Sequence, residues 1–270
     1  MTGLLRHARH EAVALARNEA HMFAARHALV HYASGAVYSF IPKNGCSTLR
    51  LSLALANNCI AGPDDWTWIH PNNETFAASL ADLVRASYSF VVVRCPHARL
   101  ASVFLDKIVD KTPELWQLYR LTRDGFDPDA VTFRAFVDLL DDSALRGANI
   151  HWRPQTDFLV YERYTNVFAL ERFDDAVRTL HERIGLAVRD ARQLTRHGTD
   201  AVELVRHGSY ADVPIADIAA MKREGRLPAH PTLYDKALRD RVSRLYAGDL
   251  AFYTDRCGRD GLTFPTTTMD

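Results

Sequence analysis

Two short apolar runs stand out in the pattern of hydrophobic and polar residues along the chain. Residues 36–41 (Ala-Val-Tyr-Ser-Phe-Ile) are apolar and aromatic, and residues 88–93 (Tyr-Ser-Phe-Val-Val-Val) are apolar and β-branched towards their end. Runs of this length and composition are typical of buried strands in a parallel sheet. Residues 166–171 predict a further short strand.

Helical patterns alternate with these strands. Residues 49–58 are rich in Leu and Ala and lack a β-branched residue, which favours a helix even though their leucines alternate as in a strand. Apolar residues recur at helical spacing in residues 96–108, 173–184 and 232–254, and residues 110–150 are expected to be mostly helical. Strands that alternate with helices predict an α/β fold of three layers, a parallel sheet with helices on both faces, and a ligand at the carboxyl ends of the strands.

The expected domain organisation is simple. A chain of 270 residues fits one large domain. We expect residues 1–30 to form an N-terminal helical extension, residues 31–257 a single domain, and residues 258–270 a disordered tail. Residues 187–231 show no strong period, and the sequence assigns no role to them.

Composition excludes several classes of function. The 33 Lys and Arg residues balance 33 Asp and Glu residues, and no basic run stands out, so a nucleic-acid partner is not expected. The four cysteines have neither C-x-x-C pairing nor zinc-ligand spacing, which favours reduced, unpaired thiols and no metal site. No apolar run is long enough for a transmembrane helix and no signal-peptide core is seen, so we expect a cytoplasmic location.

The first motif joins the first strand to the helix after it, in the segment Pro42-Lys43-Asn44-Gly45-Cys46-Ser47-Thr48. A strand, a short Gly loop and a helix in this order form an anion cradle, because loop amides and the helix N-terminus point at one place. Lys43 adds a positive charge, and Ser47 and Thr48 add hydroxyl donors. The Walker A motif is excluded because Lys43 precedes the only Gly of the loop. The ligand is therefore expected to carry a phosphate-like group.

The second motif follows the second strand. Arg94-Cys95-Pro96 ends that strand, and Pro96 suits the first position of a helix. Arg94 at the strand tip and Ser102, about a turn and a half into the helix, are expected to converge on one anion.

Both motifs resemble those of one family. The order Pro42-Lys43-x-Gly45-Cys46-Ser47-x-x-Arg50 resembles the 5′-phosphosulfate loop of sulfotransferases that use 3′-phosphoadenosine 5′-phosphosulfate (PAPS), and its Cys-Ser variant is most similar to the carbohydrate sulfotransferases of sulfotransferase family 2. The run from Arg94 to Ser102 resembles the 3′-phosphate-binding element of the same family, with Cys95 in place of the usual Asp. The segment His151-Trp152-x-Pro154 also resembles family 2.

The resemblance implies a fold, a reaction and residue roles. The fold is a sulfotransferase fold similar to that of P-loop nucleotide hydrolases. The reaction moves a sulfuryl group from PAPS, without a metal, to a hydroxyl of an acceptor such as a carbohydrate or glycolipid. Lys43 is implied as a catalytic residue, and His151 and Trp152 are placed near the cleft. The implied cofactor-binding residues are Lys43, Asn44, Gly45, Cys46, Ser47, Thr48, Arg94 and Ser102.

The catalytic base is predicted to be His70. It lies in a loop between the two motifs, where the family often keeps a His, and imidazole suits the role because its unperturbed pKa is about 6.5. Asp65, Glu74 and His151 are the competing candidates for the base.

Two other functions stay open. A nucleotide kinase-like phosphotransferase is disfavoured, because the chain lacks a Walker Lys-Ser/Thr and an evident strand-end Asp for Mg²⁺. A non-catalytic nucleotide-binding protein would keep the cradle without the chemistry. Loss of Lys43 would favour that alternative, and Lys43 is present.

Overall fold

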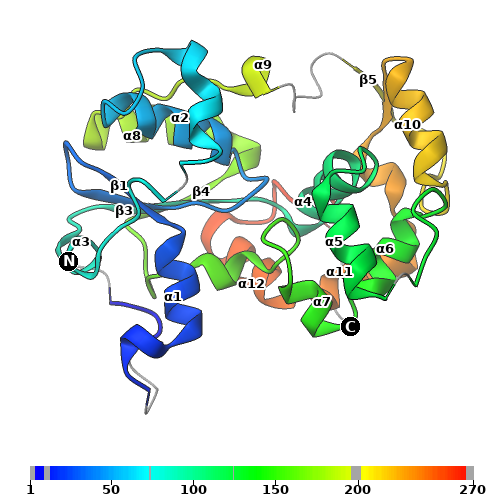
Figure 1. The fold of residues 1–270 in the computed structure, drawn as a ribbon, viewed down its shortest axis with the longest axis horizontal. Coiled ribbons are helices and arrows are strands. Elements are labelled where there is room, and N and C mark those ends of the chain that lie inside the picture. The colour runs from blue at the N-terminus through cyan, green and yellow to red at the C-terminus, as the bar shows by residue number, and fades with distance from the viewer. Residues whose placement is uncertain (1–3, 9–12, 73, 124, 196–201, 266–270) are drawn as a thin grey trace. The chain divides into compact units, whose positions relative to one another are not determined.

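The computed structural model describes residues 4–8, 13–72, 74–123, 125–195 and 202–265 (Figure 1). The chain divides into two compact units. The first comprises Met1–Arg94, Gln155–Arg196 and Tyr253–Gly261, and the second comprises Cys95–Pro154, His197–Phe252 and Leu262–Asp270. The expected single domain over residues 31–257 stays a prediction.

A four-stranded, mostly parallel sheet organises the first unit. Its strands lie in the order β1 (Ala28–His31), β2 (Ala36–Ser39), β3 (Ser89–Val93) and β4 (Asn166–Ala169). β1 pairs antiparallel with β2, whereas β2 with β3 and β3 with β4 are parallel pairs. The structure therefore confirms an α/β fold with a mostly parallel central sheet.

The strand register sets where the two predicted motifs leave the sheet. Tyr38 lies opposite Phe90, and Ser39 lies opposite Val91. β2 and β3 therefore end at the same edge of the sheet. The chain leaves β2 towards Lys43 and leaves β3 at Arg94, which are the positions where parallel sheets place their ligands.

Helices cover both faces of this sheet (Figure 1). Alternate residues of β2 belong to different apolar clusters, since Tyr38 faces one cluster and Val37 the other. The Tyr38 ring stacks on Phe90 with their centroids 4.9 Å apart. The helices in these clusters are α2 (Cys46–Ala56) and α8 (Phe173–Ile184) on the Tyr38 side, and α1 (Glu19–Arg26) and α3 (Leu80–Arg85) on the Val37 side.

The alternating leucines of α2 have a structural explanation. Leu49, Leu51 and Leu53 are each 0% exposed. Positions two apart point to different sides of a helix, about 200° around its axis. A helix buried on several sides therefore carries leucines at positions that would look like one face of a strand. Full burial of each leucine contributes about 1.5–3 kcal/mol relative to an exposed one.

The N-terminal region differs from the expected helical extension at its end. Residues 15–17 form η1 and residues 19–26 form α1, but residues 28–31 form strand β1. Pairing with β2, with Leu29 opposite Tyr38, stabilises that strand. The loop between the two motifs, in which His70 was expected to lie, contains a 3-10 helix, η2 (Pro63–Ile69). The remaining short elements of the first unit are η4 (Gln155–Phe158), η5 (Leu170–Arg172) and α9 (Arg192–Thr195).

The second unit is mainly helical around an aromatic core. Phe104 lies edge-on to Phe133, and Phe136 lies edge-on to Trp152. Residues 187–231, which showed no strong period, contain the two-stranded parallel sheet β5–β6. The elements of this unit are α4 (Pro96–Val103), the π-helical turn η3 (Phe104–Ile108), α5 (Pro113–Leu121), α6 (Phe133–Leu139), α7 (Ser143–Gly147), β5 (Glu203–Val205), α10 (Ile215–Arg223), β6 (Arg226–Pro228), η6 (His230–Leu233) and α11 (Lys236–Leu245).

The C-terminal part contains two helices where the sequence predicts one. α11 ends at Leu245, and α12 (Ala247–Cys257) starts after Tyr246. The Tyr246 hydroxyl donates to the Trp152 carbonyl at 2.6 Å, which fixes the break. Within the expected tail, the Thr263 N–H donates to the Cys95 Sγ at 3.3 Å, and residues 266–270 lie outside the described residues.

We predict that Gly45→Ala destabilises the protein more than Gly35→Ala. Both glycines are left-handed, with φ values of 72° and 66°, so an Ala at either position costs about 1–2 kcal/mol. At Gly45 an added Cβ would also lie 3.1 Å from Leu170 Cδ1, whereas nothing lies within 4 Å at Gly35. Urea unfolding measures both free energies, and equal losses would show that the close approach to Leu170 is harmless.

Candidate active site

The loop after β2 turns sharply through two left-handed residues. Lys43 has φ 70° and Gly45 has φ 72°, with Asn44 between them. The Asn44 N–H donates to the Ile41 carbonyl at 3.3 Å. A left-handed lysine is uncommon, and such backbone strain concentrates at functional sites.

Helix α2 begins directly after this loop. Its N-cap residue is Gly45, which makes no side-chain cap hydrogen bond. Ser, Thr, Asp and Asn are preferred at an N-cap because their side chains accept from the first-turn amides. Here a bound anion is able to take that place, since a helix N-terminus favours negative charge. Lys43 and Gly45 thus lie directly before the first turn of α2, and their role in binding an anion stays a prediction.

Arg94 is bonded to the same loop. It follows the last residue of β3, and its Nη1 donates to the Lys43 carbonyl at 3.0 Å. This hydrogen bond joins two residues that are 51 positions apart in the sequence. The cationic residues of the two predicted motifs are thereby connected within the first unit.

Asn44 and Gln155 form a buried amide network beneath this connection. Asn44 is 0% exposed and Gln155 is 2% exposed. Asn44 Nδ2 donates to Gln155 Oε1 at 2.6 Å and to the Val92 carbonyl at 3.0 Å. Gln155 Oε1 also accepts from the Arg94 N–H at 3.0 Å, and its Nε2 donates to the Arg94 carbonyl at 2.9 Å. The Asn44 side chain is thus directed into the protein interior, and its role in cofactor binding stays a prediction.

Sequence reasoning missed Gln155. The available signal was its position directly after the segment His151-Trp152-x-Pro154, which the resemblance placed near the cleft. A glutamine in such a segment has both a donor and an acceptor for main-chain groups.

Arg50 is a second residue to which the sequence analysis gave no role. It is 7% exposed, and burial lowers the pKa of its guanidinium. Its Nη2 donates to the Ile69 carbonyl, and its guanidinium carbon lies 5.4 Å from the Phe40 ring centroid. This bond ties the end of η2, one residue before His70, to the middle of α2.

His70 lies on the surface at the end of η2. Its N–H donates to the Thr67 carbonyl at 3.2 Å, and its ring lies edge-on to Trp66 with the centroids 5.5 Å apart. The structure thus leaves His70 exposed on a tethered segment. Of its competitors, Asp65 accepts from the Ala61 and Gly62 N–H groups, which explains that carboxylate as a helix cap.

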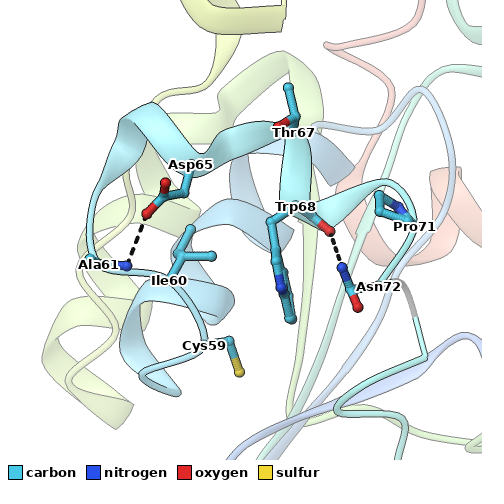
Figure 2. Close-up of a pocket in the computed structure, with 8 residues that line it drawn as sticks. All are labelled: Cys59, Ile60, Ala61, Asp65, Thr67, Trp68, Pro71 and Asn72. Atoms are coloured by element: carbon cyan, nitrogen blue, oxygen red, sulfur yellow. Dashed lines mark hydrogen bonds between the residues drawn. The ribbon is translucent and has the colours of Figure 1, made fainter.

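A surface pocket of about 600 Å³ adjoins η2. Figure 2 shows the Trp68 ring between Ile60 on one side and Asn72 on the other. The lining combines an aromatic face with polar side chains, whereas His70 is not among the lining residues. The lining residues are Cys59, Ile60, Ala61, Asp65, Thr67, Trp68, Pro71 and Asn72.

The hydroxyl and thiol residues of the first motif lie at the start of α2. Thr48 is buried, and its Oγ1 accepts from the Ala191 N–H at 3.1 Å. Ser47 and Cys46 are half-buried in the first turn. Thr48 therefore connects the first turn of α2 to the segment after α8.

Ser102 and His151 belong to the second unit. Ser102 is half-buried in the last turn of α4. His151 Nδ1 lies 2.9 Å from Asn149 Oδ1 and 3.4 Å from Glu114 Oε1. Because Arg94 lies in the first unit, the joint role of Arg94 and Ser102 on a 3′-phosphate stays a prediction.

Trp152, which the resemblance places near the cleft, is 0% exposed in the core of the second unit. Its place near a cleft stays a prediction. Its indole N–H donates to the Leu145 carbonyl at 2.9 Å. A large aromatic ring with a satisfied N–H contributes more to that core than to a solvated cleft.

In the part of the chain that the structure describes, no three His, Cys, Asp or Glu side chains gather as a metal ion would require. The same residues contain no helix that is long and apolar enough to cross a membrane.

Comparison with known proteins and families gives one match. No curated protein and no solved structure matches the chain. The model of the Sulfotransferase family, sulfotransferase family 2, matches residues 26–254 and so spans both loops. The match covers most of the chain, and the protein therefore belongs to the sulfotransferase family.

Proposed function

We propose that the protein moves a sulfuryl group from PAPS to a hydroxyl of a carbohydrate acceptor. Membership of the sulfotransferase family supports sulfuryl transfer in general. The observation that carries the choice of donor is the bond between Arg94 and the Lys43 carbonyl, directly before a helix whose N-cap residue, Gly45, has no side chain to cap it. Two cationic side chains from neighbouring strand ends suit a ligand with two anionic groups, and PAPS has a phosphosulfate and a 3′-phosphate.

The proposed reaction places most of its new charge on the leaving group. The acceptor oxygen attacks sulfur, and the bond from sulfur to the bridging phosphate oxygen breaks with its electron pair on that oxygen. The products are the sulfated acceptor and adenosine 3′,5′-bisphosphate. Lys43 and the first-turn amides of α2 would stabilise the growing phosphate charge, which is the main contribution that such a transfer needs.

Arg94 and Ser102 are proposed to hold the 3′-phosphate. One of the five guanidinium donors of Arg94 binds the Lys43 carbonyl, so its position depends on the loop that binds the phosphosulfate. Ser102 would add a hydroxyl donor. Recognition of both anionic ends distinguishes PAPS from a donor that lacks a 3′-phosphate.

His70 is proposed as the base that accepts the proton of the acceptor hydroxyl. A base within hydrogen-bond reach helps because a sugar hydroxyl is a poor nucleophile at neutral pH. The exposed ring is accessible to an acceptor, and the Arg50 bond to the Ile69 carbonyl limits the movement of its segment.

The pocket beside η2 supports a carbohydrate as the acceptor. Sugars offer apolar ring faces and many hydroxyl groups. A pocket with the Trp68 ring and the polar side chains of Asp65 and Asn72 suits both features (Figure 2).

The proposal also includes the finer fold, a three-layer sheet similar to that of P-loop nucleotide hydrolases. The order of strand, tight loop and helix at residues 36–56 supports it. Helices on both faces of the sheet support it as well.

Binding calorimetry is the first test. We expect adenosine 3′,5′-bisphosphate to bind more tightly than adenosine 5′-monophosphate or ATP with Mg²⁺. Arg94→Ala should weaken the bisphosphate by roughly 2–5 kcal/mol, because a buried phosphate loses its charged partner. The same substitution should weaken binding of the monophosphate by no more than about 1 kcal/mol, because this ligand is affected only through the lost hydrogen bond between Arg94 and the Lys43 carbonyl. Preferred binding of ATP with Mg²⁺ would instead support a kinase-like function, and equal losses for both adenosine nucleotides would limit Arg94 to the loop.

Substitution of Lys43 tests the chemical step. Lys43→Ala should lower sulfuryl transfer about 10²–10³-fold, because the leaving phosphate loses one preorganised charge. Binding of adenosine 3′,5′-bisphosphate should fall less. Lys43→Gly is the matched control, since Gly accepts φ 70° without strain and should be the more stable variant. Ala carries the same left-handed strain as Lys, so similar losses of transfer in both variants would assign the effect to the missing charge, and transfer retained in either variant would contradict this role.

Substitution of His70 tests the base. His70→Ala should lower turnover about 10²–10⁴-fold, the usual contribution of a positioned base. Bisphosphate affinity and thermal stability should stay near those of the wild type, because the side chain is exposed. A loss under about tenfold, together with a larger loss in Glu74→Ala or His151→Ala, would assign the base to one of those residues.

A further inference from the structure

Gln155 lies between the ends of β2 and β3 and contacts both loops that leave them. Its amide forms two hydrogen bonds with the main chain of Arg94, through the N–H at 3.0 Å and the carbonyl at 2.9 Å. Its Oε1 accepts from Asn44 Nδ2 at 2.6 Å. One buried side chain therefore holds the loop after β2 against the residue that ends β3.

The network allows only one orientation of each amide. Asn44 faces two acceptors, the Val92 carbonyl and Gln155 Oε1, so its Nδ2 has to point towards them. Gln155 faces one donor and one acceptor on Arg94, which fixes its Oε1 and Nε2. An ester, a carboxylate or a hydroxyl in place of the Gln155 amide cannot supply a donor and an acceptor side by side on a single planar group.

The same network also connects to the two cationic residues, Lys43 and Arg94. The Arg94 side chain donates to the Lys43 carbonyl, and Gln155 holds the Arg94 main chain. Asn44, the neighbour of Lys43, is held by Gln155 as well. The network thus closes a ring that runs from Gln155 through Arg94, Lys43 and Asn44 back to Gln155.

We infer that Gln155 is a positioning residue, which sets the spacing between Lys43 and Arg94 and so the spacing of the two anionic groups that the site accepts. The inference rests on the proposed function for the identity of the ligand. Gln155 itself contacts no reacting atom in this assignment. Its effect passes through the backbone of Arg94 and the side chain of Asn44.

The test compares Gln155→Met with Tyr161→Phe. Met has nearly the length of Gln but cannot form these hydrogen bonds. Tyr161 is the matched control, because it is a buried polar residue of the same unit whose hydroxyl donates to the Leu83 carbonyl at 2.8 Å, in the apolar cluster that contains Val37. Both variants lose buried hydrogen bonds and some stability, so a general loss of stability affects both.

Hydrogen exchange followed by mass spectrometry gives a result that needs no ligand. Amides in residues 41–50 should exchange about tenfold faster in Gln155→Met, since the loop loses a contact of about 1.4 kcal/mol. The same amides should exchange at the wild-type rate in Tyr161→Phe. Unchanged exchange in Gln155→Met, or equal acceleration in both variants, would overturn the inference.

Binding of adenosine 3′,5′-bisphosphate gives the functional result. Gln155→Met should weaken bisphosphate binding about tenfold, which corresponds to the same contact energy of about 1.4 kcal/mol. In the double variant, Asn44→Ala should add little to that loss, because both changes break one network. Adenosine 5′-monophosphate should be affected less, since it reports only one end of the site. If the wild type binds no adenosine nucleotide, the proposed function fails, while the exchange experiment still decides the role of Gln155. If the wild type binds and Gln155→Met binds equally well, the inference alone fails.

Discussion

The parallel pairing of β2 with β3 is the constraint on which the candidate site depends. Because Ser39 lies opposite Val91, both strands end at one edge, and the loops that follow them leave the sheet side by side. The distance between Lys43 and Arg94 is then short enough for a single hydrogen bond to connect them. A change of register by one residue would exchange the faces of the strand and move the whole loop.

Polar contacts hold the site in a conformation that the backbone alone would disfavour. Lys43 is left-handed, which costs about 1–2 kcal/mol for a residue other than glycine. The bonds of Arg94, Asn44 and Gln155 each contribute about 0.5–1.5 kcal/mol net, but leaving one of their buried partners unsatisfied costs more. The site is therefore maintained by a shared network, in which Asn44 Oδ1 is buried without a hydrogen-bond partner, and it is sensitive to the loss of any member. A hydrophobic core beside the loop would tolerate substitution better, since similar volumes repack.

Much of the first unit was predictable because its signals are local in the sequence. The strands at residues 36–41 and 88–93 are continuous apolar runs, and the loop between β2 and α2 carries its Gly and Lys within a few positions.

The partner of Arg94 was not predictable, because a hydrogen bond between residues 51 positions apart leaves no local pattern. Gln155 was missed for the same reason. The burial of Trp152 was not predictable either, because a motif resemblance indicates which residues occur near a cleft, and not which way each side chain points. Ser102 and His151 lie in the second unit, so their place relative to Lys43 stays a prediction.

The buried leucines of α2 have a consequence for how the chain folds. Helix α2 packs in one apolar cluster with residues of β4, α8 and the segment up to Leu194, which follow it by more than a hundred positions. During synthesis from the N-terminus, this strongly apolar helix emerges long before those partners exist. Contacts between such distant segments close slowly, and exposed apolar surface in the interval promotes aggregation. We therefore expect productive folding of the first unit to wait for the chain beyond β4, and the nascent chain to be prone to aggregation up to that point.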